Sequence, residues 1–260
     1  MNDKPTIYFL IPVLNEALNI ERLFSSLQEL WRNYEPRFII RFILIDDGST
    51  DGTGEEILKN SRSFQLDCEI LSHPKNLGPG KAFQTAFLHI APLLSDVDWI
   101  VTMEGDNTSR VELLNQMFER AKEGYEVIFA SPYAYGGAVL NTSSIRVILS
   151  NIANTFVKEF LGVQGIFTVS SFFRLYRATA LKKLQRVYGA QILEKDGFEC
   201  MLEMLMKMID LKMGISEVPM VLDTKRRLGK SKMKIVKTIL AYFSLWTYKR
   251  KWMNMAKGIT

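Results

Sequence analysis

Short, almost wholly apolar runs alternate with longer amphipathic stretches through the first half of the chain. The apolar runs predict β-strands and lie at residues 7–13, 38–45, 69–71, 99–103 and 127–130. The stretches between them carry apolar residues at helical spacing and lie at residues 17–31, 54–60, 81–91 and 111–122. Alternation of such strands with helices predicts an α/β fold. We expect a Rossmann-like, mostly parallel sheet with helices on both faces.

The pattern becomes less regular after residue 131. We expect a helix over residues 144–161, a strand over 167–176, a methionine-rich helix over 198–213 and a strand over 215–222. A basic loop at residues 225–234 then precedes an apolar and basic stretch. The sequence therefore predicts one catalytic domain over residues 1–234, followed by an amphipathic C-terminal tail over residues 235–260.

Acidic residues follow three of the predicted strands, at the sheet edge where parallel α/β folds bind ligands. These carboxylates are Glu16 after the first strand, Asp46 and Asp47 after the second, and Glu104 and Asp106 after the fourth. Each alone could be a turn or a helix cap. Three such groups at one edge would repel each other unless a ligand or a cation compensates them, so they indicate a binding site.

Two longer segments make the prediction specific. Residues 46–53 read Asp-Asp-Gly-Ser-Thr-Asp-Gly-Thr, and residues 73–82 read His-Pro-Lys-Asn-Leu-Gly-Pro-Gly-Lys-Ala. Both resemble motifs of the family 2 glycosyltransferases, which implies a GT-A type fold and a nucleotide-sugar donor. By resemblance, the donor-binding residues are Pro12, Asn15, Glu16, Asp46, Asp47, Lys81 and Gly105.

The Glu104-Gly105-Asp106 segment stands where the family has an Asp-x-Asp motif. The resemblance implies that Glu104 and Asp106 bind Mg²⁺ or Mn²⁺ together with the donor diphosphate. Such a cation is chemically reasonable, because the leaving diphosphate gains negative charge that a hard cation held by carboxylates neutralises.

The second half is similar to the dolichyl-phosphate mannosyltransferase branch of the family. The matching segments are Gly197-Phe198-Glu199, Ser216-Glu217-Val218-Pro219 and Arg226-x-x-Gly229-x-Ser231-Lys232. This resemblance implies sugar transfer from GDP-mannose or a UDP-sugar to a polyprenyl-phosphate lipid. By resemblance, the acceptor-binding residues are Ser131, Arg146, Arg226, Ser231 and Lys232, and the catalytic residues are Asp106, Arg146 and Arg226.

The chemistry of the acceptor decides whether a base is needed. A phosphate acceptor is already an anion, so in-line displacement with inversion rests on positioning and electrostatics. A hydroxyl acceptor would need a general base, for which Asp106, Glu199 and Glu203 are candidates.

Several positions differ from the branch pattern, which keeps other functions open. Glu104 replaces the usual aspartate, Thr108 stands where a glutamine is common, and Pro132 replaces an arginine. One alternative is a family 2 enzyme with a glycolipid or polysaccharide acceptor. The other is a non-catalytic relative that binds a nucleotide sugar.

Charge and composition bound the partners and the location. The net charge of +5 suits an anionic substrate or membrane surface and is too small to indicate nucleic acid. Cys68 and Cys200 are far apart and read as reduced thiols. No apolar run reaches the roughly 18 residues that span a bilayer. We expect a cytoplasmic protein that is peripheral on the cytosolic face of a membrane, where residues 144–161 and the tail lie in the interface or pack on the domain or an anchoring subunit.

Overall fold

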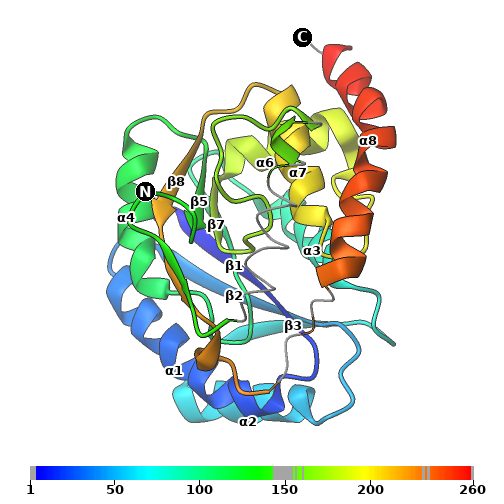
Figure 1. Ribbon diagram of the computed structural model, residues 1–260. Coiled ribbons are helices and arrows are strands. Elements are labelled where there is room, and N and C mark those ends of the chain that lie inside the picture. The colour runs from blue at the N-terminus through cyan, green and yellow to red at the C-terminus, as the bar shows by residue number, and fades with distance from the viewer. Residues whose placement is uncertain are drawn as a thin grey trace.

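The computed structural model describes residues 4–142, 155, 157–159, 161–229, 232 and 235–258, the side chains of 235–237 excepted. A seven-stranded sheet runs through its centre (Figure 1) in the order β3-β2-β1-β4-β7-β5-β8. Its strands are β1 (Thr6–Val13), β2 (Ile39–Asp46), β3 (Cys68–Ser72), β4 (Trp99–Thr102), β5 (Val127–Ser131), β7 (Arg174–Arg177) and β8 (Ile215–Pro219). All neighbouring strands pair in parallel except at β7, which is antiparallel to both β4 and β5.

Helices cover both faces of this sheet (Figure 1). One face packs against α1 (Ala17–Tyr34), α2 (Thr53–Phe64) and α4 (Leu114–Lys122), the last preceded by the 3-10 turn Val111–Leu113. The other face packs against α3 (Pro79–Ile90), α6 (Ala178–Tyr188), α7 (Cys200–Asp210) and α8 (Ile235–Lys257). The predicted α/β class, mostly parallel sheet and two helical layers are confirmed.

Strand β1 shows why its sequence is apolar throughout. Successive side chains of a strand point to opposite faces, so a strand with helices on both sides buries all of them. Ile7, Phe9 and Ile11 join the core beneath α1, whereas Tyr8 and Leu10 join the core beneath α3. None of these five side chains is more than 8% exposed.

Two predicted strands of the second half are wrong in extent. Only Arg174–Arg177 of the expected strand at residues 167–176 is β-structure, because residues 167–173 are irregular backbone held by side chains of other segments. The expected strand at residues 215–222 is divided into β8 and β9 (Val221–Asp223). Strand β9 leaves the main sheet and pairs in parallel with β6 (Ala138–Leu140), which no pattern predicted. The expected helix at residues 144–161 falls mostly outside the described residues.

Helix α8, the predicted tail, packs on the body of the protein. Its Tyr242, Leu245, Trp252 and Ala256 side chains are at most 4% exposed and belong to the same core as α6 and α7. Among the described helices, none has the length and hydropathy that crossing a bilayer requires. The helix therefore contributes both to the core and to an exposed surface.

A close backbone contact ties the loop before α3 to the segment before α7. The amide of Gly80 donates to Asp196 O at 2.8 Å. A Cβ atom at Gly80 would lie 1.9 Å from Lys195 O, and one at Gly78 would lie 2.3 Å from Asp196 O. Only glycine fits at these two positions, so the 73–82 motif keeps its glycines for packing as well as for any ligand.

Candidate functional site

The acidic residues after β1, β2 and β4 meet at one edge of the sheet, as their positions in the sequence predict. Val13 pairs with Asp46 at the ends of β1 and β2, and Leu10 pairs with Thr102 at the end of β4. The segments that follow these strands therefore leave the sheet side by side. A cavity of about 370 Å³ opens at this edge.

The cavity collects most of the predicted donor and metal residues. Its lining includes Pro12, Glu16, Asp47, Glu104, Gly105, Asp106 and Lys232. Asn15 and Asp46 line a neighbouring hollow that shares Leu14 and Asn76 with the cavity. The two hollows therefore adjoin each other at the strand ends.

The loop after β4 aims its two carboxylates at the cavity. Gly105 lies so close to β1 that a Cβ atom there would stand 2.5 Å from Val13 Cγ1. Asn107 adopts a left-handed backbone with φ of 66° and donates from Nδ2 to Asn19 O at 3.0 Å. A glycine and an asparagine are therefore needed here to turn the chain sharply beneath Glu104 and Asp106.

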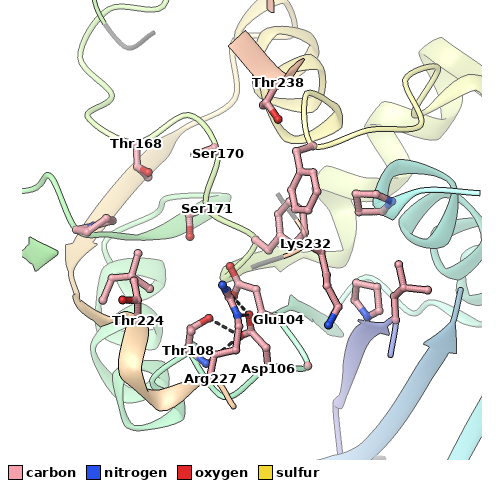
Figure 2. Close-up of a pocket in the computed structure, with 18 of the residues that line it drawn as sticks. Glu104, Asp106, Thr108, Thr168, Ser170, Ser171, Thr224, Arg227, Lys232 and Thr238 are labelled. Carbon is pink, nitrogen blue, oxygen red and sulfur yellow. Dashed lines mark hydrogen bonds and ion pairs between the residues drawn. The ribbon is translucent and has the colours of Figure 1, made fainter. Parts of the chain in front are cut away.

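Both carboxylate oxygens of Asp106 are engaged within the protein. Its Oδ1 accepts hydrogen bonds from Thr108 N at 3.0 Å and Thr108 Oγ1 at 2.5 Å. Its Oδ2 forms an ion pair with Arg227, which follows the 3-10 turn η4 (Thr224–Arg226). Figure 2 shows Arg227 beside Glu104, Asp106 and Thr108.

Unlike Asp106, Glu104 forms no ion pair with a basic side chain among the described residues. Its carboxylate accepts a hydrogen bond from Ser109 Oγ. Burial raises the pKa of Glu104, and the neighbouring charge of Asp106 raises that pKa further. The site therefore holds negative charge that a further cation would stabilise.

The two carboxylates fit the chemistry of a Mg²⁺ or Mn²⁺ site. Their oxygen atoms are hard ligands, and the repulsion between them is the kind that a divalent cation relieves. No third histidine, cysteine or carboxylate joins them within the part of the chain that the structure describes. Glu104 and Asp106 would hold the ion, and donor phosphates would have to complete its coordination. Arg227 would first have to release Asp106.

Asp47 holds the 73–78 loop against the sheet. Its Oδ1 lies 2.7 Å from His73 Nδ1 and accepts from Leu77 N at 2.9 Å, while its Oδ2 accepts from Gly78 N at 2.8 Å. Asp47 is 3% exposed. The carboxylate thus acts first on the protein itself, and it presents the loop that contributes Asn76 to the cavity.

Glu16 connects the start of α1 to the basic segment. Its Oε2 accepts from Asn19 Nδ2 at 2.5 Å, and its Oε1 lies 3.5 Å from Lys232 Nζ. Lys232 Nζ also donates to Asn15 O at 2.9 Å. Burial raises the pKa of Glu16, Lys232 opposes this rise, and Asp106 adds to it.

Another wall of the cavity is made by residues 168–172, which carry hydroxyl and apolar side chains (Figure 2). Glu217 accepts from Phe167 N at 2.7 Å and from Thr168 N at 2.8 Å. Arg174 is fully buried and donates to Ser171 O at 2.7 Å and Val169 O at 3.1 Å. These two charged side chains therefore fix the wall without facing the cavity.

Apolar side chains line much of the rest of the cavity. They come from β6, β9, the wall at residues 168–172, the segment before α7 and α8, and they are Val139, Val169, Phe172, Phe198, Met220, Leu222, Ile239 and Tyr242. The cavity thus has an acidic part at the strand ends and a more apolar part between the β6–β9 pair and α8. A ligand that is anionic at one end and hydrocarbon at the other matches this division.

Other predicted residues are not brought to the cavity. Lys81 Nζ donates to Gln84 Oε1 at 2.7 Å. Ser131 is buried, and its Oγ accepts from Ala134 N at 3.1 Å. Arg226 lies on η4 outside the cavity lining, where its carbonyl accepts from Arg22 at 3.2 Å. Arg146 and Ser231 lie outside the described residues.

Glu203 is wrong as a candidate general base. Its side chain is fully buried and pairs with Lys207 Nζ at 2.6 Å. Its two carboxylate oxygens also accept from Glu194 N at 2.8 Å and Lys195 N at 2.9 Å. Every part of this carboxylate is engaged within the protein, away from the cavity.

Three residues of the site were missed in the sequence. Arg227 directly follows Arg226, the arginine of the Arg226-x-x-Gly229-x-Ser231-Lys232 motif. Asn19 is 1% exposed within α1, between apolar neighbours, and a polar residue at such a position is a signal for a specific partner. Arg174 lies in a predicted strand and carried no signal beyond its charge.

Residues 8–185 match the sequence profile of the family described as Glycosyl transferase family 2. Among curated relatives, a polyprenol monophosphomannose synthase of Mycolicibacterium smegmatis is 25% identical over 86% of this chain and 79% of its own length. A dolichyl-phosphate β-glucosyltransferase of Trichomonas vaginalis is 26% identical over 94% of this chain and 74% of its own length. A dolichol-phosphate mannosyltransferase of Pyrococcus furiosus is 28% identical over 90% of this chain but only 60% of its own length.

Solved structures with the same fold have lower sequence identity. Glucosyl-3-phosphoglycerate synthase from Mycobacterium tuberculosis, in complex with Mn²⁺, UDP and glucosyl-3-phosphoglycerate, has a TM-score of 0.62 at 15% identity, over 92% of this chain and 80% of its own. A mannosyltransferase from Pyrobaculum calidifontis, in complex with GDP-Man and Mn²⁺, has a TM-score of 0.55 at 14% identity, over 99% of this chain and 74% of its own. These likenesses identify a GT-A type fold. Because the family profile matches more than half of the sequence, the chain belongs to glycosyl transferase family 2.

Proposed function

We propose that the protein is a metal-dependent, inverting glycosyltransferase that moves a sugar from a nucleotide-diphosphate donor to a polyprenyl phosphate. The observation that carries this proposal is the division of the cavity into an acidic part and an apolar part. The acidic part suits a cation with a diphosphate, and the apolar part suits an isoprenoid chain. Curated relatives that are named for polyprenol or dolichol phosphate support the same acceptor class.

In this proposal the residues of the chain act mainly by positioning. Glu104 and Asp106 would hold the Mg²⁺ or Mn²⁺, and the ion would supply positive charge to stabilise the leaving diphosphate. Glu16, Asp47 and the loop of Asn76 shape the donor side. An oxygen of the acceptor phosphate forms the new bond to the anomeric carbon as the bond to the nucleoside diphosphate breaks on the opposite face. No proton has to be removed, because that oxygen is already ionised.

A two-substrate assay tests this proposal. Purified protein with Mn²⁺ or Mg²⁺ would be given radiolabelled GDP- or UDP-sugars together with a polyprenyl phosphate. We expect label to enter the organic phase as an acid-labile lipid-linked sugar, and chelation of the cation to stop this. A polyprenol without phosphate and a short water-soluble phosphate ester serve as acceptor controls. Transfer to neither lipid nor control, with intact donor binding, would favour the non-catalytic alternative.

We also propose that the protein works at a membrane surface through the exposed face of α8. Leu240, Phe243 and Trp246 are 64%, 47% and 66% exposed, and basic residues follow them in the same helix. Aromatic and aliphatic side chains beside cations are typical of helices that lie in the membrane interface. We place this surface on the cytosolic face of the membrane in the same proposal. Attachment through a membrane-anchoring subunit is the alternative.

A flotation measurement with anionic vesicles tests the membrane proposal. Wild-type protein should float with the vesicles, and Trp246→Glu should lower the bound fraction several-fold by burying a charge in the interface. Trp31→Glu is the matched control, since Trp31 is 40% exposed on α1, on the other side of the sheet. Equal binding of the two variants would contradict a role for this face. Absence of binding by wild type would instead favour an anchoring subunit.

A further inference from the structure

Arg227 occupies the one carboxylate oxygen of Asp106 that no other residue in the described part of the chain contacts. Thr108 satisfies Oδ1 with both its amide and its hydroxyl. Nε and Nη2 of Arg227 both face Oδ2. The side chains of Arg227 and Asp106 are 18% and 10% exposed, so the pair is largely shielded from solvent. A cation that binds Asp106 at Oδ2 therefore competes directly with the guanidinium.

The position of Arg227 does not depend on this ion pair alone. Asn19 receives a hydrogen bond from Leu228 N at 2.9 Å and donates to Leu228 O at 2.9 Å. Lys232, from the same segment, binds Glu16 and Asn15. The backbone next to Arg227 is thus anchored by Asn19, and the guanidinium is free to change partners while the backbone stays in place.

The charges around the cavity show what the guanidinium of Arg227 contributes: it neutralises Asp106. Arg227 and Lys232 come from the same basic segment, and each neutralises one carboxylate of the cavity, Asp106 and Glu16 respectively. In Figure 2, Arg227 lies on the Asp106 side and Lys232 lies apart from it. Without Arg227, Glu104 and Asp106 would face each other with no basic partner among the described side chains, apart from hydroxyl and amide donors.

We propose that Arg227 is a built-in counter-ion of Asp106, which a divalent cation must displace and which then becomes available to the anionic phosphates of the donor. The first half concerns the free protein and the cation only, while the second half rests on the proposed function. Two consequences follow. The free protein binds the cation weakly, and a nucleoside diphosphate strengthens that binding by giving Arg227 another anionic partner. Coupling free energies of this kind change affinity by about 5- to 150-fold.

The test measures Mn²⁺ binding rather than catalysis. Free Mn²⁺ would be followed by electron paramagnetic resonance during titration of the protein, first alone and then with UDP or GDP. Arg227→Gln should bind Mn²⁺ at least about 5-fold more tightly than wild type in the absence of nucleotide. The gain in Mn²⁺ affinity on adding nucleotide should be smaller in this variant than in wild type. Arg227→Lys, which keeps the charge on a different head group, should lie between the two.

Lys225→Gln is the matched control. Lys225 is exposed and lies two residues before Arg227, so this variant also removes one positive charge from the segment. Its Mn²⁺ affinity should equal that of wild type, and circular dichroism should show that all variants are folded. An affinity of Arg227→Gln for Mn²⁺ that is unchanged or weaker, in a folded protein, would overturn the proposal. Because neither sugar nor lipid is present, a failed transfer assay would not change this result, and the two proposals can fail separately.

Discussion

Replacement of Asp106 by asparagine is expected to lower kcat/KM for sugar transfer by about 10²- to 10³-fold, the usual effect of removing one preorganised electrostatic group. Asparagine has the same shape and can still accept the hydrogen bonds from Thr108 N and Oγ1. It lacks the charge that a divalent cation and Arg227 both require. Steady-state kinetics over a range of Mn²⁺ concentrations would measure the loss, which excess cation should not restore.

Asp67→Asn is the control for this experiment. Asp67 is 96% exposed at the side chain and lies 3.9 Å from Arg41, so its loss should leave both activity and stability nearly unchanged. Thermal unfolding of both variants would separate a catalytic effect from a folding defect. A rate for Asp106→Asn within a few-fold of wild type would mean that the cavity does not use this carboxylate in the reaction.

Replacement of Lys207 by methionine is expected to lower the free energy of unfolding by about 3–5 kcal/mol. Lys207 is fully buried, and its Nζ donates to Glu203 Oε1 at 2.6 Å, Gln191 O at 2.8 Å and Ile192 O at 3.0 Å. Methionine fills a similar volume but leaves the charge of Glu203 buried without its cation. Denaturant unfolding followed by circular dichroism would measure the loss.

Two further variants show whether the buried charge is the cause. Lys182→Met breaks the exposed pair between Lys182 and Asp96 and should cost less than about 1 kcal/mol. Glu203→Gln combined with Lys207→Met should recover part of the stability, because neither charge is then left alone in the core. Equal losses for Lys207→Met and Lys182→Met would contradict this explanation.

The first half of the fold could be predicted because its pattern is local. Strand β1 is apolar on both faces, and helix α1 repeats its buried residues Ile20, Leu23, Phe24 and Leu27 at helical spacing. The second half depends on pairings that no local pattern shows. Strand β7 lies between β4 and β5 in the sheet. The three-residue strands β6 and β9 pair with each other although residues 141–220 lie between them in the sequence. Helix α6 is not among the predicted elements, although Leu181, Leu184 and Val187 are buried at helical spacing.

The acidic part of the site could be predicted because parallel strands bring their carboxyl ends together. The sequence could not predict which of the two neighbouring arginines, Arg226 or Arg227, reaches the cavity. Neighbouring side chains in turns and extended backbone point in different directions, and here the direction depends on an anchor far away in the sequence. Asn19 binds Leu228 across 209 positions of the chain, and this contact brings Arg227 to Asp106.

The reversed direction of β7 has a consequence for how such a protein can diversify. An antiparallel strand begins at the sheet edge where its neighbours end. The segment that lies at the cavity is therefore the one that precedes β7, whereas β1, β2 and β4 contribute the segments that follow them. The wall at residues 168–172 can therefore change its sequence while the turns after β1, β2 and β4 stay as they are. Under the proposed function, in which the apolar part of the cavity receives the isoprenoid chain, a change in this one segment would alter the acceptor side and leave the acidic strand ends as they are.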